Sequence, residues 1–200
     1  MRTAVLVPVK AFRVAKRRLA GVLSDGERAS LARCMATKVI AAAGSLPAHV
    51  VCDDDEVAAW AQWAGAEVLW RPGRGLNGAV ADGVASLAAL GYDHAIVAHA
   101  DLPLAHDLER VARPHLITLV PDRHDGGTNV IGLPTGIPFR FGYGHGSFRR
   151  HVTEAGRHGL GLRVWRDKAL GTDVDLPDDL ALPAVREVVP CPPTIRASLG

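Results

Sequence analysis

Residues 5–10 read VLVPVK, a short apolar run that ends on a cation. The apolar residues do not alternate with polar ones, which is typical of a strand buried on both faces of a parallel sheet. We therefore predict that residues 5–9 form a central strand. The run is far shorter than the ~18 residues needed to span a membrane, so we expect neither a secretion signal nor a membrane helix.

The segments that follow alternate between helix and strand patterns. Ser24 and Glu27 have the spacing of a capping box, which predicts a helix over residues 25–43. We expect further helices at residues 56–64, 76–90 and 147–159, and strands at residues 49–52, 67–70, 94–98, 116–120, 129–133, 163–165 and 172–176. This alternation predicts an α/β sheet with helices on both faces and right-handed crossovers.

Length and composition narrow the classes of function. With 200 residues, 48% of them hydrophobic, residues 1–200 can form one domain with a full core. A formal net charge of +2 does not imply a nucleic-acid partner. Cys34, Cys52 and Cys191 lack C-x-x-C spacing, which predicts neither a disulfide framework nor a zinc site. A cytoplasmic location is expected.

The loop between the first strand and the first helix is long and basic. Ligands of open α/β sheets bind beyond the carboxyl ends of the strands, and about 14 residues exceed the usual length of such a loop. A basic loop at this place can wrap a triphosphate, although a solvated loop without function is the alternative. Its cations are Lys10, Arg13, Lys16, Arg17 and Arg18.

Three aspartates follow strand-like segments. Asp101 comes directly after residues 94–98, where a carboxylate can hold Mg²⁺. The alternative is a cap for a helix that starts near Pro103. Asp173 and Asp175 form a D-x-D pair on one side of an extended segment, unless they belong to a turn that enters the next helix. Together the three carboxylates predict a metal site able to carry two ions.

Residues 122–151 are rich in glycine and in hydrogen-bond donors. Thr128, Asn129, Ser147 and backbone N–H groups can cradle phosphate or carboxylate oxygens. Ser147 is also expected to cap the helix that follows it. The alternative is a glycine-rich hairpin followed by an ordinary cap.

Two helices carry further candidates. Asn77 can address a nucleotide base or sugar, or it can cap the helix over residues 76–90. Trp60 and Trp63 are expected to pack in and beside the core rather than to stack on bases. The chain contains no G-x-S-x-G elbow and no P-loop motif, which argues against a serine hydrolase and a P-loop kinase.

Six segments, in order, carry a resemblance to a known family. They are VPVK with AKRRLA, GLNGA, HADLPL, DGGTNV, FGYGHGSFRRH and TDVDLPDDL, and they span residues 7–180. The sequence resembles the guanylyltransferases that make the activated phospho-acid in the biosynthesis of the deazaflavin coenzyme F-420. These are 2-phospho-L-lactate guanylyltransferase and phosphoenolpyruvate guanylyltransferase. The resemblance implies a single-domain nucleotidyltransferase fold of the glycosyltransferase-A type, a Rossmann-like mixed sheet.

The same resemblance implies roles for individual residues. The metal-binding aspartates, expected to hold Mg²⁺, are Asp101, Asp173 and Asp175. The residues implied to bind GTP are Lys10, Arg13, Lys16 and Asn77. Lys16 and Asp101 are the implied catalytic residues. The acceptor-binding residues are Thr128, Gly144 and Ser147.

The implied reaction joins GMP from GTP to the phosphate of a small phospho-acid and releases pyrophosphate. An ionised phosphate needs no general base, so catalysis is expected to rest on positioning and charge neutralisation. The composition, rich in Arg, Ala and Gly, is typical of a high-GC actinobacterium, for which the resemblance favours phosphoenolpyruvate. Alternatives are 2-phospho-L-lactate or 3-phosphoglycerate as acceptor, a sugar-phosphate nucleotidyltransferase, or a non-catalytic nucleotide sensor. Direct handover of the product to the next transferase is a further hypothesis.

Overall fold

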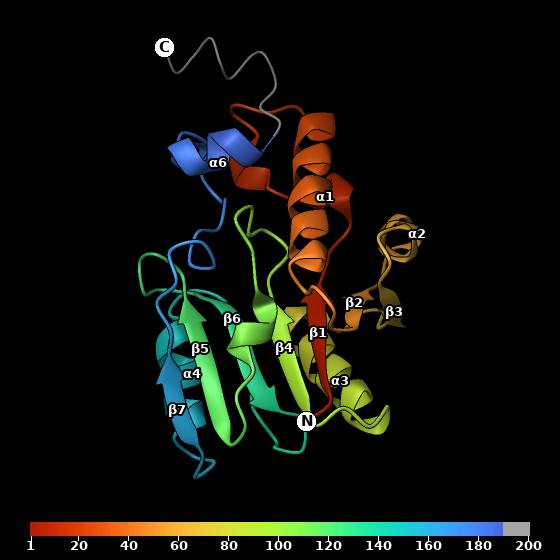
Figure 1. The fold of residues 1–200 in the computed structure, drawn as a ribbon. Coiled ribbons are helices and arrows are strands. Elements are labelled where there is room, and N and C mark those ends of the chain that lie inside the picture. Colours follow the sequence, from red (N-terminus) through yellow and green to blue (C-terminus); the bar gives the residue numbers. More distant parts are fainter. Residues whose placement is uncertain (190–200) are drawn as a thin grey trace.

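A seven-stranded mixed sheet forms the centre of the computed structural model, which describes residues 1–189 (Figure 1). The strand order is β3-β2-β1-β4-β6-β5-β7. The strands are β1 (Thr3–Pro8), β2 (Ala48–Cys52), β3 (Glu67–Trp70), β4 (His94–Ala98), β5 (Leu116–Pro121), β6 (Thr128–Pro134) and β7 (Gly161–Val164). Strands β3, β2, β1 and β4 are parallel, whereas β6 runs antiparallel to both β4 and β5. The predicted α/β class is confirmed.

Strand β1 is central and buried on both faces, as its apolar run predicts. Leu6 pairs with His49 of β2 on one side and with Val97 of β4 on the other. Successive side chains of a strand point to opposite faces. Accordingly, Leu6 packs in the cluster that contains α3 (Gly75–Ala89), and Val7 in the cluster that contains α1 (Asp25–Ala41).

Helices cover both faces of the sheet. Helices α1 and α2 (Asp55–Trp63) pack on one face, and α3 and α4 (Ser147–Ala155) pack on the other, behind the sheet in Figure 1. The predicted capping box starts α1, because Ser24 Oγ accepts from the Glu27 N–H and the Glu27 carboxylate accepts from the Ser24 N–H. The remaining helices are η1 (Phe12–Val14), η2 (Arg17–Leu19), η3 (Leu108–Val111), α5 (Pro177–Leu180) and α6 (Pro183–Val188).

A third apolar cluster lies beyond the carboxyl ends of the strands. It joins Leu19 of η2 and Met35 of α1 to Val174, Leu180 and Val185 near the C-terminal end of the described chain. Residues 174–185 are thereby held against the basic loop, above the sheet in Figure 1. This packing places the D-x-D segment next to the loop that carries the cations.

Two expectations about elements, and the alternative role considered for Asp101, are wrong. Residues 172–176 form an irregular loop and not a strand, because the N–H groups of Asp175 and Leu176 bond the Asp179 carboxylate instead of a neighbouring strand. Helix α4 ends at Ala155, four residues earlier than predicted. No helix starts near Pro103, so Asp101 caps none.

The tryptophans and cysteines can also be placed. Trp60 is buried and packs edge-on against Phe12 with the ring centroids 5.2 Å apart. The packing expected of Trp63 is wrong, since its side chain faces outward at the end of α2 and is 78% exposed. Cys34 and Cys52 are free thiols, and Cys191 lies outside the described residues. No helix within residues 1–189 has the length and apolar character needed to cross a membrane.

Gly132 allows η3 to lie close against β6. A Cβ at this position would come within 2.9 Å of Val111 Cγ1 and 3.0 Å of the Val111 carbonyl oxygen. We expect Gly132→Ala to lower the free energy of unfolding by about 1–3 kcal/mol, because backbone must shift to make room. Urea unfolding measures this change. The control is Gly136→Ala, whose Cβ would meet no atom within 4 Å; equal stability of the two variants would contradict the packing argument.

Candidate active site

The basic loop and the segment after β4 enclose a cavity at the carboxyl edge of the sheet. The cavity has a volume of about 270 Å³ and is lined by Pro8, Lys10 and Lys16 from the loop side and by His99 and Asp101 from the β4 side. Apolar side chains from α1 complete the wall. Ligands of open α/β sheets bind at this edge, so the cavity is the candidate nucleotide site.

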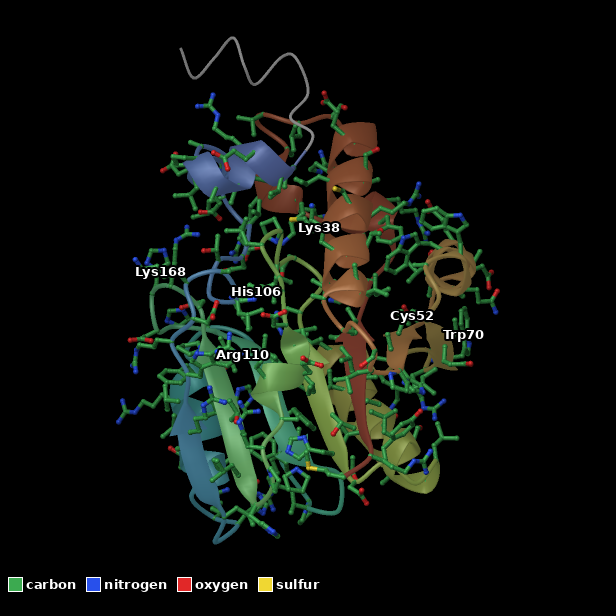
Figure 2. All side chains as sticks on the ribbon, viewed as in Figure 1. Lys38, Cys52, Trp70, His106, Arg110 and Lys168 are labelled. Carbon is green, nitrogen blue, oxygen red and sulfur yellow. The ribbon has the colours of Figure 1, made fainter. Side chains whose placement is uncertain are left out.

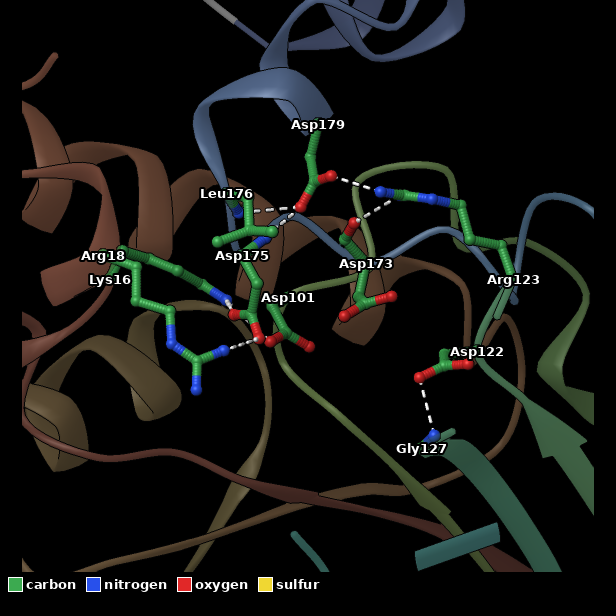
Figure 3. A network of polar contacts seen from close by, with 10 residues as sticks. All are labelled: Lys16, Arg18, Asp101, Asp122, Arg123, Gly127, Asp173, Asp175, Leu176 and Asp179. Carbon is green, nitrogen blue, oxygen red and sulfur yellow. Dashed lines mark hydrogen bonds and ion pairs between the residues drawn. The ribbon is translucent and has the colours of Figure 1, made fainter. Parts of the chain in front are cut away.

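Lys16 ties together two of the three predicted metal-binding aspartates. Its Nζ donates to Asp101 Oδ2 at 2.7 Å and to Asp175 Oδ1 at 2.8 Å (Figure 3). The Lys16 side chain is only 9% exposed. Burial lowers its pKa, but the charges of Asp101 and Asp175 outweigh burial and raise the pKa to about 12. Lys16 is therefore a permanent ammonium ion at the centre of the site.

The backbone of Lys16 is strained. Its φ of 51° and ψ of 41° lie in the left-handed region, which costs a non-glycine residue about 1 kcal/mol. The residue separates the short helices η1 and η2. The strain persists because the two ion pairs hold the side chain between the aspartates.

Asp173 lies in the same electrostatic environment. Burial, followed by the charges of Asp101 and Asp175, raises the pKa of Asp173 to about 6. By contrast, the Lys16 charge outweighs burial at Asp101 and lowers the pKa of that carboxyl. Figure 3 shows the three carboxylates facing one region. An additional cation in this region would be stabilised by Asp173 in particular.

A partly buried ion pair, not predicted from the sequence, holds the D-x-D segment in place. Asp179 Oδ2 accepts from the N–H of Asp175 at 2.6 Å and of Leu176 at 2.8 Å, while Asp179 Oδ1 binds Arg123 (Figure 3). Arg123 Nη1 also donates to the Asp173 carbonyl at 3.3 Å. The pair thus fixes the backbone of both aspartates. Asp179 could be recognised from its place in the first turn after Pro177, but Arg123 is 56 residues away in the chain.

The donor set is suited to a hard divalent cation. All three aspartates offer carboxylate oxygens, the ligands that Mg²⁺ prefers, and Asp101 Oδ1 is a buried acceptor without a hydrogen-bond partner. Among residues 1–189, no three Asp, Glu, His or Cys side chains are already gathered as an ion-binding group. In the described structure Asp101 and Asp175 instead share the Lys16 ammonium. The three-aspartate metal site remains a prediction.

The predicted acceptor residues lie at the start of β6 and of α4. Thr128 and Ser147 are buried, and Gly144 turns the chain with a φ of 110°. The Ser147 N–H donates to the Gly144 carbonyl at 3.0 Å. The expectation that Ser147 caps α4 is wrong: Gly146, with a φ of 71°, is the N-cap, and the Ser147 side chain makes no capping hydrogen bond.

His151 fixes the hydroxyl of Thr128. The Gly142 N–H donates to His151 Nε2 at 2.9 Å, so in the neutral ring Nδ1 carries the proton and donates to Thr128 Oγ1 at 2.9 Å. Burial, reinforced by the charge of Arg150, lowers the pKa of His151 to about 4 and keeps the ring neutral. The Thr128 hydroxyl hydrogen is then left to donate to a bound group.

The remaining nucleotide-site candidates have different surroundings. Lys10 lines the cavity, whereas Arg13 pairs with Asp54, the N-cap of α2. Asn77 does not cap α3, whose N-cap is Arg74; its Oδ1 accepts from the Tyr143 N–H at 2.7 Å. Asn77 therefore joins α3 to the segment that carries the acceptor residues.

Two solved structures show the class of this fold. A nucleotide-diphospho-sugar transferase structure from Desulfovibrio desulfuricans G20 superposes with a TM-score of 0.72 at 19% identity, over 90% of this chain and 84% of that one. A nucleotidyl transferase from Methanothermobacter gives 0.62 at 15% identity, over 90% and 94%. The fold is that of the nucleotidyltransferases.

The family is defined by sequence. Residues 3–183 match the family described as guanylyl transferase CofC like, and the chain belongs to it. Phosphoenolpyruvate guanylyltransferase of Sphaerobacter thermophilus is 36% identical over 189 residues, 90% of this chain and 91% of that protein. The 2-phospho-L-lactate guanylyltransferase of Methanothermobacter thermautotrophicus is 32% identical over 90% of this chain and 83% of its own. The 3-phospho-D-glycerate guanylyltransferase of Phenylobacterium zucineum is 33% identical over 82% of each.

The raised pKa of Asp173 predicts that its charge destabilises the metal-free protein. We expect Asp173→Asn to raise the free energy of unfolding by about 1–2 kcal/mol at pH 7.5, a value discounted for partial exposure. The folded-state pKa of about 6 lies above the ordinary 3.8, so the gain is complete above pH 6 and vanishes as the pH falls toward 3.8.

Thermal unfolding in EDTA between pH 4 and pH 8 measures this gain. Asp175→Asn is the matched comparison, because it removes a partner of Lys16 and is expected to lower stability. A gain for Asp173→Asn that grew toward pH 4, or no gain at any pH, would refute the assignment.

Proposed function

We propose that the protein transfers GMP from GTP to the phosphate of phosphoenolpyruvate, releases pyrophosphate and forms enolpyruvyl-diphospho-guanosine for deazaflavin coenzyme F-420 biosynthesis. Membership of a guanylyl transferase family supports the reaction class. The observation that carries the proposal is the meeting of Lys16 with Asp101 and Asp175 beside a cavity at the carboxyl edge. This arrangement supplies cations and metal ligands where a triphosphate can lie.

Charge neutralisation is the main task of the site. The acceptor phosphate oxygen attacks the α-phosphorus of GTP in line, the bond to the β-phosphate oxygen breaks, and pyrophosphate leaves. An ionised phosphate needs no general base, but two polyanions repel strongly without nearby cations. Lys16 and Lys10 line the cavity and bind the triphosphate.

Asp101, Asp173 and Asp175 are the residues that would hold Mg²⁺. When bound, the ion neutralises phosphate charge and polarises the reacting phosphoryl group. Lys16 bridges Asp101 and Asp175 in the described structure, so its ammonium would share these carboxylates with a bound Mg²⁺ or leave them. The Lys16 ammonium would then be available to pair with the triphosphate oxygens.

The acceptor binds between Thr128 and the segment 144–147. The Thr128 hydroxyl, held by His151, the Ser147 hydroxyl and the backbone N–H groups of residues 144–146 donate to its carboxylate or phosphate oxygens. Thr128 and Ser147 are buried, so binding requires the glycine-rich turn to move. Phosphoenolpyruvate and 2-phospho-L-lactate differ at the carbon that bears the phosphate, and 2-phospho-L-lactate or 3-phosphoglycerate is the alternative acceptor. Handover of the product to the next cytoplasmic transferase remains a hypothesis.

A panel of nucleotides and acceptors tests the proposal. We expect pyrophosphate release with GTP, Mg²⁺ and phosphoenolpyruvate, and far slower release with 2-phospho-L-lactate, 3-phosphoglycerate, sugar 1-phosphates, ATP, CTP or UTP. Fastest turnover with another phospho-acid would keep the reaction class and change the acceptor. No turnover with any pair, despite GTP binding, would support a nucleotide sensor.

Thr128→Val tests the acceptor site. The variant keeps the shape of the side chain but loses the hydroxyl, so we expect the KM for the phospho-acid to rise about 10- to 100-fold, as for the loss of a hydrogen bond to a charged group. The KM for GTP is expected to stay within about twofold of the wild-type value, far less than the change expected for the phospho-acid. Steady-state kinetics with each substrate varied in turn measure both values; a rise confined to GTP would place Thr128 on the nucleotide instead.

A further inference from the structure

A second cavity lies beside the first, at the carboxyl ends of β1, β2 and β3. Its volume is about 290 Å³, and its lining is largely apolar, including Val51 and Leu76. Pro8, Lys10 and Leu76 line both cavities, so the two are adjacent. Figure 2 shows Cys52 and Trp70, the last residues of β2 and β3, on this side of the molecule. A largely apolar slot next to a phosphate site suits a purine ring.

Three charged residues line this second cavity: Lys10, Asp53 and Arg71. The guanidinium of Arg71 already donates to the Trp70 carbonyl at 2.6 Å and to Ser86 Oγ at 2.6 Å. Asp53 directly follows β2 and is exposed; within residues 1–189 its carboxylate has neither a hydrogen bond nor an ion pair. Its neighbour Asp54 is buried, caps α2 and binds Arg13. Asp53 is thus the acidic side chain of this slot that is free to bind a ligand.

The chemistry of a free carboxylate distinguishes the purines. Guanine presents two adjacent donors, N1–H and the N2 amino group, which a carboxylate can accept in a bidentate pair. Adenine presents an unprotonated N1 at the same place, and its lone pair repels a carboxylate. Charge-assisted pairs of this kind are stronger than neutral hydrogen bonds. A lone aspartate at the rim of the slot therefore selects guanine.

We propose that Asp53 is the specificity-determining residue that accepts hydrogen bonds from N1–H and N2–H of the guanine base. The inference rests on the proposed function and names the residue by which the enzyme selects GTP. With the base in the second cavity, the triphosphate extends past Lys10, which lines both cavities, to Lys16 and Asp101 in the first. The ribose then lies against the shared wall formed by Pro8 and Leu76.

Base analogues test this assignment atom by atom. Isothermal titration calorimetry with Mg²⁺ and no acceptor compares GTP, ATP, ITP, which lacks the N2 amino group, and XTP, which has a carbonyl oxygen there. Wild type is expected to bind GTP at least tenfold more tightly than ITP or XTP. Asp53→Asn is expected to lose about 10- to 100-fold in GTP affinity and to bind XTP more tightly than GTP, because the asparagine amide can donate to the XTP oxygen.

Asp55→Asn is the matched control. Asp55 is an exposed acid two residues away, in the first turn of α2, and does not line the cavity. This variant is expected to keep the wild-type ratio of GTP to XTP affinity. Pyrophosphate release with GTP varied at a fixed, saturating acceptor concentration adds a second readout: Asp53→Asn is expected to raise the KM for GTP while kcat stays within a few-fold.

The outcomes separate this inference from the proposed function. Suppose that wild type prefers GTP to ATP but Asp53→Asn keeps the wild-type ratio of GTP to XTP affinity. This result would overturn the role of Asp53 and leave guanylyl transfer intact. Wild type that binds ATP as tightly as GTP would count against the guanylyl transferase function and also overturn the inference. A preference reversed toward XTP in Asp53→Asn, but not in Asp55→Asn, would support it.

Discussion

The ion pairs of Lys16 hold the carboxyl edge of the sheet together. Its ammonium joins Asp101, just beyond β4, to Asp175, on a segment that contributes no strand to the sheet. Without a cation between them, these carboxylates and Asp173 would repel one another in a partly buried space. The left-handed backbone of Lys16 shows that the loop adopts a costly conformation to place this charge. Electrostatic repulsion among the carboxylates therefore constrains the geometry of the site, and the Lys16 ammonium supplies the positive charge that holds Asp101 and Asp175 close together.

A second layer of polar contacts makes this arrangement rigid. The Arg123–Asp179 pair fixes the backbone on both sides of Val174, and Val174 itself is buried in the apolar cluster with Leu19 and Met35. Burial raises the pKa of Asp179, but hydrogen bonds from Leu176, Asp175 and Arg123 outweigh burial and lower it. Asp179 thus remains an acceptor while the neighbouring Asp173 is close to neutrality in mildly acidic solution. The two carboxylates differ because hydrogen-bond donors outweigh burial at Asp179, whereas burial and the charges of Asp101 and Asp175 outweigh the donors near Asp173.

Local signals in the sequence predicted the scaffold well. The unbroken apolar run of β1 and the capping box of α1 depend on neighbours in the chain, and both appear as predicted. Residues 172–176 have the pattern of a short strand, but the Asp179 carboxylate takes the N–H groups that a strand would need. The partnership of Arg123 with Asp179, and of His151 with Thr128, joins residues far apart in sequence and has no local signature. Sequence motifs identified the candidate site residues, but the residues that position them by hydrogen bonds and ion pairs were found only in the folded structure.

The reversed direction of β6 has a consequence for how this fold can diversify. Because β6 runs antiparallel to β4, Val130 pairs with Ala98, and the beginning of β6 lies where β4 ends. Thr128 and Asp101 are thus attached to one backbone ladder, and main-chain hydrogen bonds set the spacing between the proposed acceptor residues and the proposed nucleotide site. Side chains around the proposed acceptor site take no part in these main-chain hydrogen bonds, so exchanging them leaves the register of the ladder intact. The fold can therefore keep one proposed nucleotide site while the side chains that contact the small acid vary.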